Sequence, residues 1–118
     1  MANPLRGSVS LPVGDRTYTL SFSVNALCEL EVELGGVPIP QIAERLNDEK
    51  NISMATVRAV VWAGLQDHHP EVDLKGAGLI VTEAGIAPCM EATGKAFSLA
   101  FPEAKGGVNP RRAGRSVR

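Results

Sequence analysis

Aromatic side chains are scarce in this sequence, since phenylalanine, tryptophan and tyrosine together make up 4% of its 118 residues. The core must therefore be built from aliphatic and alanine side chains, which favours packed helices. No apolar run approaches the roughly 20 residues that a membrane-spanning helix needs. The first residues, MANPLRG, lack the apolar stretch of a signal peptide. These absences predict a cytoplasmic protein with one modest core.

An excess of charge of one sign is also lacking, because 12 basic residues stand against 13 acidic ones and the formal net charge is −1. This balance implies no global attraction to nucleic acid or to an anionic membrane. The distribution is less even, since four basic residues fall in the last eight positions. These four are the candidate partner-binding residues: Arg111, Arg112, Arg115 and Arg118.

The end of the chain, EAKGGVNPRRAGRSVR, contains glycine, proline and arginine but almost no large apolar residue. This composition predicts a flexible Arg-rich tail over residues 103–118, behind a single domain over residues 1–102. Binding of nucleic-acid phosphates by the tail is an alternative, which would be independent of base sequence and sensitive to salt. The tail has no aromatic residue for base stacking, so its composition favours an ordinary disordered terminus.

Cysteine and histidine are limited to two residues each. Cys28 and Cys89 lie inside helical patterns, and both are predicted to be buried free thiols, as suits a reducing cytoplasm. Cys89 follows Pro88 at the start of a helix, where thiol pKa values fall. It is therefore the better candidate of the two for a reactive thiol.

The segment WAGLQDHHP holds both histidines side by side. Adjacent residues on a helix point roughly 100° apart, so His68 and His69 do not both face one metal ion. A zinc site also collects three or four donors, and the sequence has no third histidine. The pattern instead predicts the C-terminal end of a helix, at which His68 and His69 meet the unpaired carbonyls and the negative end of the helix dipole.

Patterns of catalytic residues are absent as well. Glu29, Glu31 and Glu33 alternate along one predicted helix, so they do not converge as an acid–base pair and are expected on a solvated face. No phosphate-binding GxxxxGK pattern occurs among the glycines. We therefore expect no enzyme, no cofactor and no metal site.

Period-two patterning marks residues 7–22 as a β-hairpin. Val9, Leu11 and Val13 alternate with small or polar residues, and so do the apolar residues after the turn dipeptide Gly14-Asp15. Pro12 lacks the N–H of a strand residue, which predicts that its strand lies at an edge. A two-stranded sheet is marginal alone and needs a helical layer against one face.

From Ser23 onward the apolar period is helical, and caps and breakers predict about five helices. The predicted fold class is α+β, mostly α, with an N-terminal hairpin packed on a bundle of short helices. Val57, Val61 and Leu65 are predicted at the centre of its core. The residues expected to point inward are Val24, Leu27, Leu30 and Leu34; Ile42 and Leu46; Met54, Val57, Val60, Val61, Gly64 and Leu65; Leu74, Ala77, Ile80, Val81 and Ala84; and Met90, Gly94, Phe97 and Phe101.

Five segments together resemble the gene transfer agent family of small phage-tail proteins: ANPLRGSVSL, YTLSFSVNALCELEVELG, MATVRAVVWAGL, HHPEVDL and VTEAG. The resemblance covers about residues 2–102 and implies a role in the tail morphogenesis of prophages and gene transfer agents. The family carries no catalytic motif, so the resemblance assigns no functional residue. The proline-rich GVPIPQ and the Arg-rich tail depart from the family pattern.

The resemblance allows either a tail-tube relative or a tail assembly chaperone. Tube subunits are similar to large β-structures that close into a ring, and one hairpin of about seven residues per strand does not supply that wall. A chaperone needs a small scaffold with apolar grooves for an elongated helical client, and the tape-measure protein is such a client. The resemblance therefore favours a chaperone that binds the tape-measure and tail-tube proteins.

Two further functions remain open on the sequence. One is a structural tail component, associated with the tube, that is retained in the particle. The other is a small nucleic-acid-binding regulator that uses the Arg-rich tail. Self-association is compatible with each of these functions.

Overall fold

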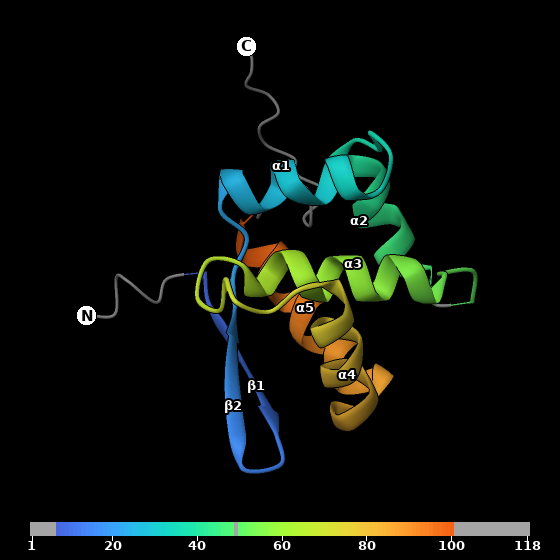
Figure 1. Cartoon of the computed structure of the whole chain (residues 1–118). Coiled ribbons are helices and arrows are strands. Elements are labelled where there is room, and N and C mark those ends of the chain that lie inside the picture. The colour runs from blue at the N-terminus through green and yellow to red at the C-terminus, as the bar shows by residue number, and fades with distance from the viewer. Residues whose placement is uncertain (1–6, 49, 101–118) are drawn as a thin grey trace.

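The computed structural model describes residues 7–48 and 50–100 of the chain. A β-hairpin is followed by five helices in the described part (Figure 1), which confirms the α+β, mostly α fold class. None of these helices is long and apolar enough to cross a membrane. The elements are β1 (Val9–Val13), β2 (Arg16–Leu20), α1 (Val24–Glu33), α2 (Ile39–Asn47), α3 (Met54–Leu65), α4 (Leu74–Ala84) and α5 (Ile86–Ala100).

The hairpin has the predicted register, with Val13 opposite Arg16 across the turn and Leu11 opposite Tyr18. Gly14 has a φ of 60°, and within residues 7–48 and 50–100 only glycines have a positive φ, so the turn follows the type II′ pattern. Leu11, Val13 and Leu20 are buried. Their face packs against α5 and α4 on the β1 side and against α3 on the β2 side.

The two edges of the hairpin differ in how their outward amides are used. Because the turn has two residues, Val9, Leu11 and Val13 form the pairs whose backbone groups bond across the ladder. The backbone nitrogens of Pro12 on β1 and Thr19 on β2 therefore point away from the partner strand. The Thr19 N–H donates to His69 Nε2 over 3.0 Å, and just past the strand the Ser21 N–H donates to the Gly64 carbonyl over 2.9 Å. Pro12 faces outward on β1, where its missing N–H costs no ladder bond.

Side-chain caps start three helices. The Ala26 N–H donates to Ser23 Oγ over 3.1 Å, and Thr56 N–H donates to Ser53 Oγ over the same distance. At α4 the Gly76 N–H donates to Asp73 Oδ1 over 2.8 Å. Each cap satisfies an amide that has no partner inside its helix, which fixes where the helix begins.

Glycines end two helices. At the end of α1 the Gly35 N–H donates to the Val32 carbonyl and the Gly36 N–H to the Glu31 carbonyl. With Gly35 at a φ of 83°, these two bonds form a Schellman motif. Gly85 ends α4 at a φ of 99°, a conformation that L side chains rarely adopt.

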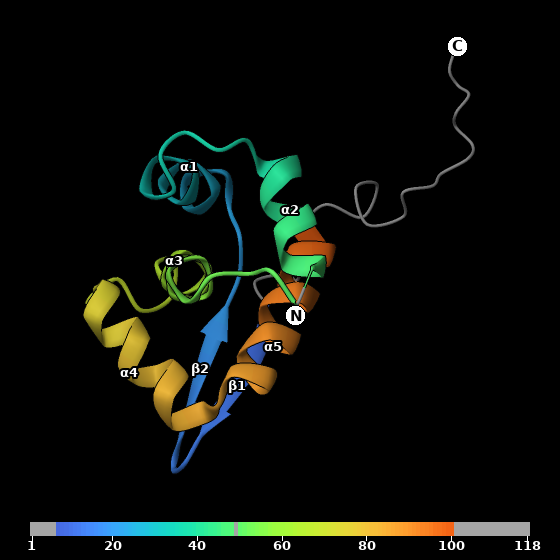
Figure 2. The same cartoon turned by 90° about the vertical axis from the view of Figure 1, so that its right-hand side faces the viewer.

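Helix α3 lies at the centre of the molecule. In Figure 2 it is seen nearly end-on, with α1 above it, α4 below it and the hairpin beside it. It contacts α1, α4, α5 and β2. Val57, Val61 and Leu65 are at most 1% exposed, so the predicted core centre is confirmed. Gly64 allows the hairpin exit to cross this helix closely, because a Cβ there would lie 3.2 Å from Phe22 Cζ.

Three predicted helix faces are shifted. Val24 and Met54 each stand at the first position of a helix and are 75% and 55% exposed, so their predicted inward orientation is wrong. In α5 the buried face is formed by Cys89, Ala92, Thr93, Ala96 and Phe97 rather than by Met90 and Gly94, which are half-buried. Phe97 is common to the predicted and the observed face, and its ring packs edge-on against Phe22 at 4.9 Å between ring centroids. Phe101 lies outside the described residues.

Candidate functional site

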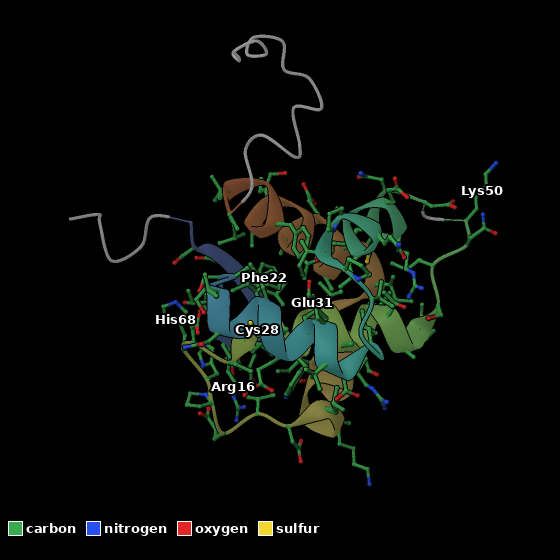
Figure 3. All side chains as sticks on the ribbon, turned by 90° about the horizontal axis from the view of Figure 1, so that it is seen from above. Arg16, Phe22, Cys28, Glu31, Lys50 and His68 are labelled. Atoms are coloured by element: carbon green, nitrogen blue, oxygen red, sulfur yellow. The ribbon has the colours of Figure 1, made fainter. Side chains whose placement is uncertain are left out.

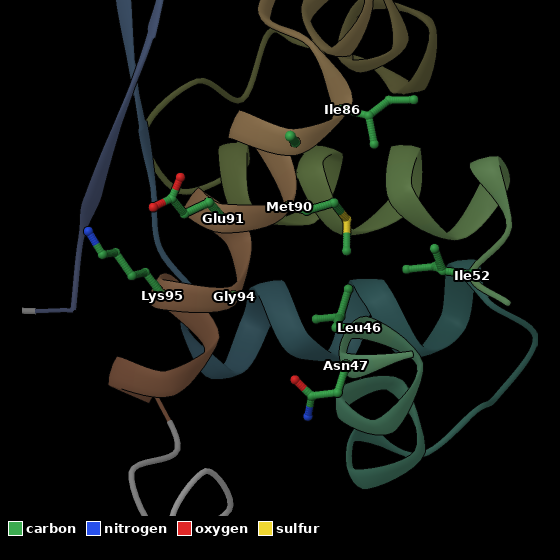
Figure 4. Close-up of a pocket in the computed structure, with 9 residues that line it drawn as sticks. Leu46, Asn47, Ile52, Ile86, Met90, Glu91, Gly94 and Lys95 are labelled. Carbon is green, nitrogen blue, oxygen red and sulfur yellow. The ribbon is translucent and has the colours of Figure 1, made fainter. Parts of the chain in front are cut away.

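An open groove of about 620 Å³ lies where α2, the loop before α3 and α5 come together. Leu46 of α2, Ile52 of the loop and Met90 of α5 converge on it, with Ile86 at its upper end (Figure 4). Ile86 is 47% exposed, so the groove presents apolar surface to solvent. A cavity of this size is within the range that binds small molecules or several side chains of a partner.

The groove is open because α2 and α5 approach each other through few side chains. On α2 only Ile42 and Leu46 are buried, and α2 packs on α5 more sparsely than the other helices pack on α3. Gly94 contributes to the opening from α5, since a Cβ built there would meet no atom within 4 Å. Met90 is unbranched and half-buried, so it can adapt to different partner side chains.

Polar side chains border the groove rather than fill it. Glu91 and Lys95 are spaced by four residues on α5 and point away from Leu46 and Ile52 in Figure 4. Asn47 lies at the end of α2 on another side of the opening. An apolar floor with charges of both signs at its border is suited to one face of an amphipathic helix.

Helix α2 is held at its N-terminus by a carboxylate from α1. Glu31 is half-buried, and its Oε2 accepts from the Ile39 N–H over 3.0 Å. The negative charge lies at the positive end of the α2 dipole, where it stabilises the helix. The prediction that Glu29, Glu31 and Glu33 all lie on a solvated face is therefore wrong for Glu31 and right for the other two, which are exposed.

The segment from Trp62 to Pro70 is a structural junction. As predicted, it contains the end of α3, which stops at Leu65. Asp67 accepts from Ser23 Oγ over 2.9 Å and from Ser21 Oγ and the Ser23 N–H over 3.3 Å. This carboxylate ties the end of α3 to the start of α1.

The histidine side chains do not cap α3 in the predicted way. His69 Nε2 accepts from the Thr19 N–H on β2, so it is an acceptor and not a donor to helix carbonyls. Its ring also packs edge-on against Tyr18, at 5.2 Å between centroids. The amides of His68 and His69 donate to the Leu65 carbonyl and close the helix through the backbone. The prediction failed because Thr19 is 50 residues away in sequence.

His68 is exposed (Figure 3), and its ring is tilted relative to that of His69, with 6.5 Å between centroids. Among residues 7–48 and 50–100, no three His, Cys, Asp or Glu side chains are grouped so that they can hold a metal ion. His69 already uses Nε2 within the fold. The chemistry of this segment is that of a hydrogen-bonded joint between α3 and the hairpin.

The two cysteines have opposite surroundings. Cys28 is exposed on α1, so its predicted burial is wrong, whereas Cys89 is a buried free thiol as predicted. Burial raises the pKa of Cys89, which disfavours the thiolate and with it a nucleophilic role. Cys89 lies in the first turn of α5, but the helix start does not lower its pKa, because desolvation dominates.

The four candidate arginines, Arg111, Arg112, Arg115 and Arg118, lie outside the described residues, as does the predicted tail over residues 103–118. The groove was not predicted residue by residue, because it is formed by α2, α5 and a loop that the sequence separates. Its apolar residues are visible in the sequence, but no pattern within one segment indicates that they converge.

Comparison with known proteins gives one match for the chain. A protein-family model described as "Phage tail tube protein, GTA-gp10" matches residues 6–101. No curated protein and no solved structure gives a significant match. The matched residues include every helix and strand of the described structure, so the family match applies to the whole fold, groove included.

Proposed function

We propose a role in tail assembly from one premise: the chain belongs to the phage tail tube protein family GTA-gp10. Within that family we infer a tail assembly chaperone, without enzymatic activity, that acts in the host cytoplasm. Its client is the tape-measure protein, whose apolar helices must be shielded from solvent until the tube encloses them. The tail-tube subunit is its second partner.

The open groove is the observation that carries this proposal. Leu46, Ile52 and Met90 form one apolar surface that is accessible from solvent. A helix that inserts apolar residues at successive turns would bury that surface. The half-buried Met90 supports binding to several related client segments, since methionine adapts its shape at low cost.

The hairpin supports the chaperone over a subunit of the tube wall. Its β2 edge has the Thr19 N–H bonded to His69, and its β1 edge has Pro12. A wall built by joining strands between subunits needs rows of free edge amides. The described chain offers only short edges of this kind.

A structural tail component is the second candidate, and the description of the family as a tail tube protein favours it. On this alternative the protein stays in the finished particle, and the groove of Leu46 and Met90 contacts a neighbouring tail protein permanently. The two candidates use the same surface but differ in how long the contact lasts.

Quantitative mass spectrometry of purified particles separates these candidates. A chaperone is expected to be absent or far below the amount of the tube subunit, although it is required for particle formation. A fixed stoichiometric ratio to other tail proteins would establish the structural component and overturn the chaperone.

Co-expression with the tape-measure protein of the same tail tests the groove itself. Ile86→Lys places a charge on the apolar rim and should leave the tape-measure protein insoluble, whereas the wild-type chain keeps it in solution. Leu79→Lys on α4 is the matched control, since Leu79 is 66% exposed and does not line the groove. Equal solubility of the client with both variants would show that the groove does not hold it.

A further inference from the structure

A second apolar surface lies on α1, away from the groove. Val24 and Val32 are 75% and 76% exposed, and Cys28 is exposed between them. The three residues are spaced by four positions, so they form one stripe along the helix, about 12 Å long. Figure 3 looks down on the side of α1 that carries Cys28. None of the three residues lines the groove.

Carboxylates border the stripe on one side. By helical geometry Glu29 and Glu33 lie there and are exposed, whereas the Glu31 carboxylate is held at the Ile39 N–H. Helix α1 contains no basic residue between Val24 and Glu33. Its outer surface is therefore apolar along the stripe and negative at the margin that carries Glu29 and Glu33.

The glutamates and the exposed valines lower the local stability of α1. Glu31 and Glu33 lie in the last turn, where a negative charge is unfavourable to the helix dipole and a basic residue would be favourable. Valine is also a weaker helix former than the straight-chain residues that suit an exposed position. Sequences depart from local rules in this way mainly at functional surfaces.

We propose that the stripe of Val24, Cys28 and Val32 binds an amphipathic helix of a partner protein, with lysine or arginine at the margins of its apolar edge. The apolar residues of that helix would pack on the two valines, and its cations would face Glu29 and Glu33. This inference does not rest on the proposed function, because it concerns a different surface.

Charge disfavours a second copy of the chain as the occupant. Pairing α1 with itself about a two-fold axis at Cys28 would bring Glu29 and Glu33 of both copies together, with no cation of α1 between them. Composition disfavours the residues that follow α5. They are basic, but they contain the poor helix formers Gly106, Gly107 and Pro110, and Val117 follows Val108 by nine residues.

The reaction rate of Cys28 with Ellman's reagent measures binding at the stripe. Cys28 is exposed and reacts, whereas the buried Cys89 is protected. The probe is a synthetic amphipathic helix of about three heptads with leucine on its apolar edge and lysine at the margins. At a peptide concentration about ten times its Kd, Cys28 should react about tenfold more slowly. A peptide with glutamate in place of lysine should leave the rate unchanged, and Cys28→Ser gives the background.

Two variants locate the site at exposed positions, where substitutions are expected to leave the fold intact. Val32→Asn, and the double change Glu29→Gln with Glu33→Gln, should each remove most of the protection of Cys28. Leu79→Asn on α4 is the matched control and should keep it.

Several results would overturn the proposal. An unchanged Cys28 rate at saturating lysine peptide would exclude the site, and equal protection by the glutamate peptide would exclude the role of charge. Protection that rises with protein concentration alone would assign the stripe to a second copy. Faster reaction after removal of residues 101–118 would assign it to the chain's own terminus.

Discussion

Gly64 and Gly94 are both within helices, yet their surroundings are opposite. A Cβ at Gly64 would lie 3.2 Å from Phe22 Cζ, inside the contact between α3 and the hairpin exit. A Cβ at Gly94 would meet nothing within 4 Å. The same residue type therefore has a packing role in α3 and leaves space in α5.

We expect substitutions at the two glycines to change stability in opposite directions. Gly94→Ala should raise the free energy of unfolding by about 0.5–1 kcal/mol, because alanine restricts the unfolded chain and favours the helix. Gly64→Val should lower it by about 1–3 kcal/mol, since Phe22 must shift. Urea unfolding of both variants measures these changes. Stabilisation by Gly64→Val would show that the Phe22 ring moves aside without a cost in stability.

Cys89 predicts a dependence of stability on pH. Burial raises its pKa in the folded state, whereas the unfolded thiol ionises near pH 8.5. Below that pH both states hold the proton, so the thiol adds no pH dependence. Above about pH 8.5 the unfolded state loses its proton first, and the free energy of unfolding falls as pH rises.

Unfolding measured from pH 7 to pH 10 checks this expectation. Cys89→Ala should flatten the decline above about pH 8.5, although it also lowers stability at every pH by leaving a small cavity. Cys28→Ser is the control and should keep the decline, because Cys28 is exposed. If the free energy of unfolding fell equally with pH in wild type and Cys89→Ala, Cys89 would not be its cause.

At the scale of elements, α2 is the helix with the weakest attachment. It buries Ile42 and Leu46 and is held at its start by the Glu31 carboxylate. Helix α3, in contrast, is surrounded by α1, α4, α5 and β2. We infer that α2 opens locally while α3 remains folded.

Hydrogen exchange of backbone amides tests this order. Amides in α2 should exchange through local opening that is insensitive to low denaturant, whereas those of α3 should exchange only through global unfolding. Glu31→Gln should speed exchange in α2 by several-fold and leave α3 unchanged, since it removes the charge at Ile39 N–H. Equal protection of both helices would show that α2 and α3 open together.

The elements were predictable where their signals are local. Ser53 and Asp73 cap helices within three residues, and Gly85 ends α4 by its own conformation. What failed depends on distant partners: the acceptor role of His69 is set by Thr19 on another element. The exposure of Val24 was missed because periodicity finds apolar positions but not the side that a neighbour covers.

The candidate surfaces were less predictable than the fold. The groove combines Leu46, Ile52 and Met90 from three segments, and no pattern within any one segment indicates their convergence. On α1 the spacing of Val24, Cys28 and Val32 is visible in the sequence. Cys28 was nevertheless expected inside, because free cysteines are among the residues most often buried.

At the scale of the whole molecule, the first strand packs against the last helix. Phe97 of α5 packs edge-on against Phe22, so α5 is joined to the segment that follows the hairpin. Truncation from the C-terminus should therefore leave the stability nearly unchanged until it removes Phe97, and should then unfold the protein.

We expect removal of residues 105–118 to change the free energy of unfolding by less than about 0.5 kcal/mol, since only two valines there are large and apolar. Removal of residues 95–118 also deletes Ala96 and Phe97 and should cost more than about 3 kcal/mol. Circular dichroism during thermal unfolding measures both. A large loss from the shorter deletion would show that residues 105–118 contribute to the core.

Pro12 has a consequence for the behaviour of the protein in crowded solution. An unprotected strand edge is a template on which further chains add as fibrils. On β1 the outward position of Pro12 interrupts that template, because an incoming strand finds no amide to accept from. Strand addition at this position therefore lacks a backbone hydrogen bond, which disfavours the growth of a fibril on the β1 edge.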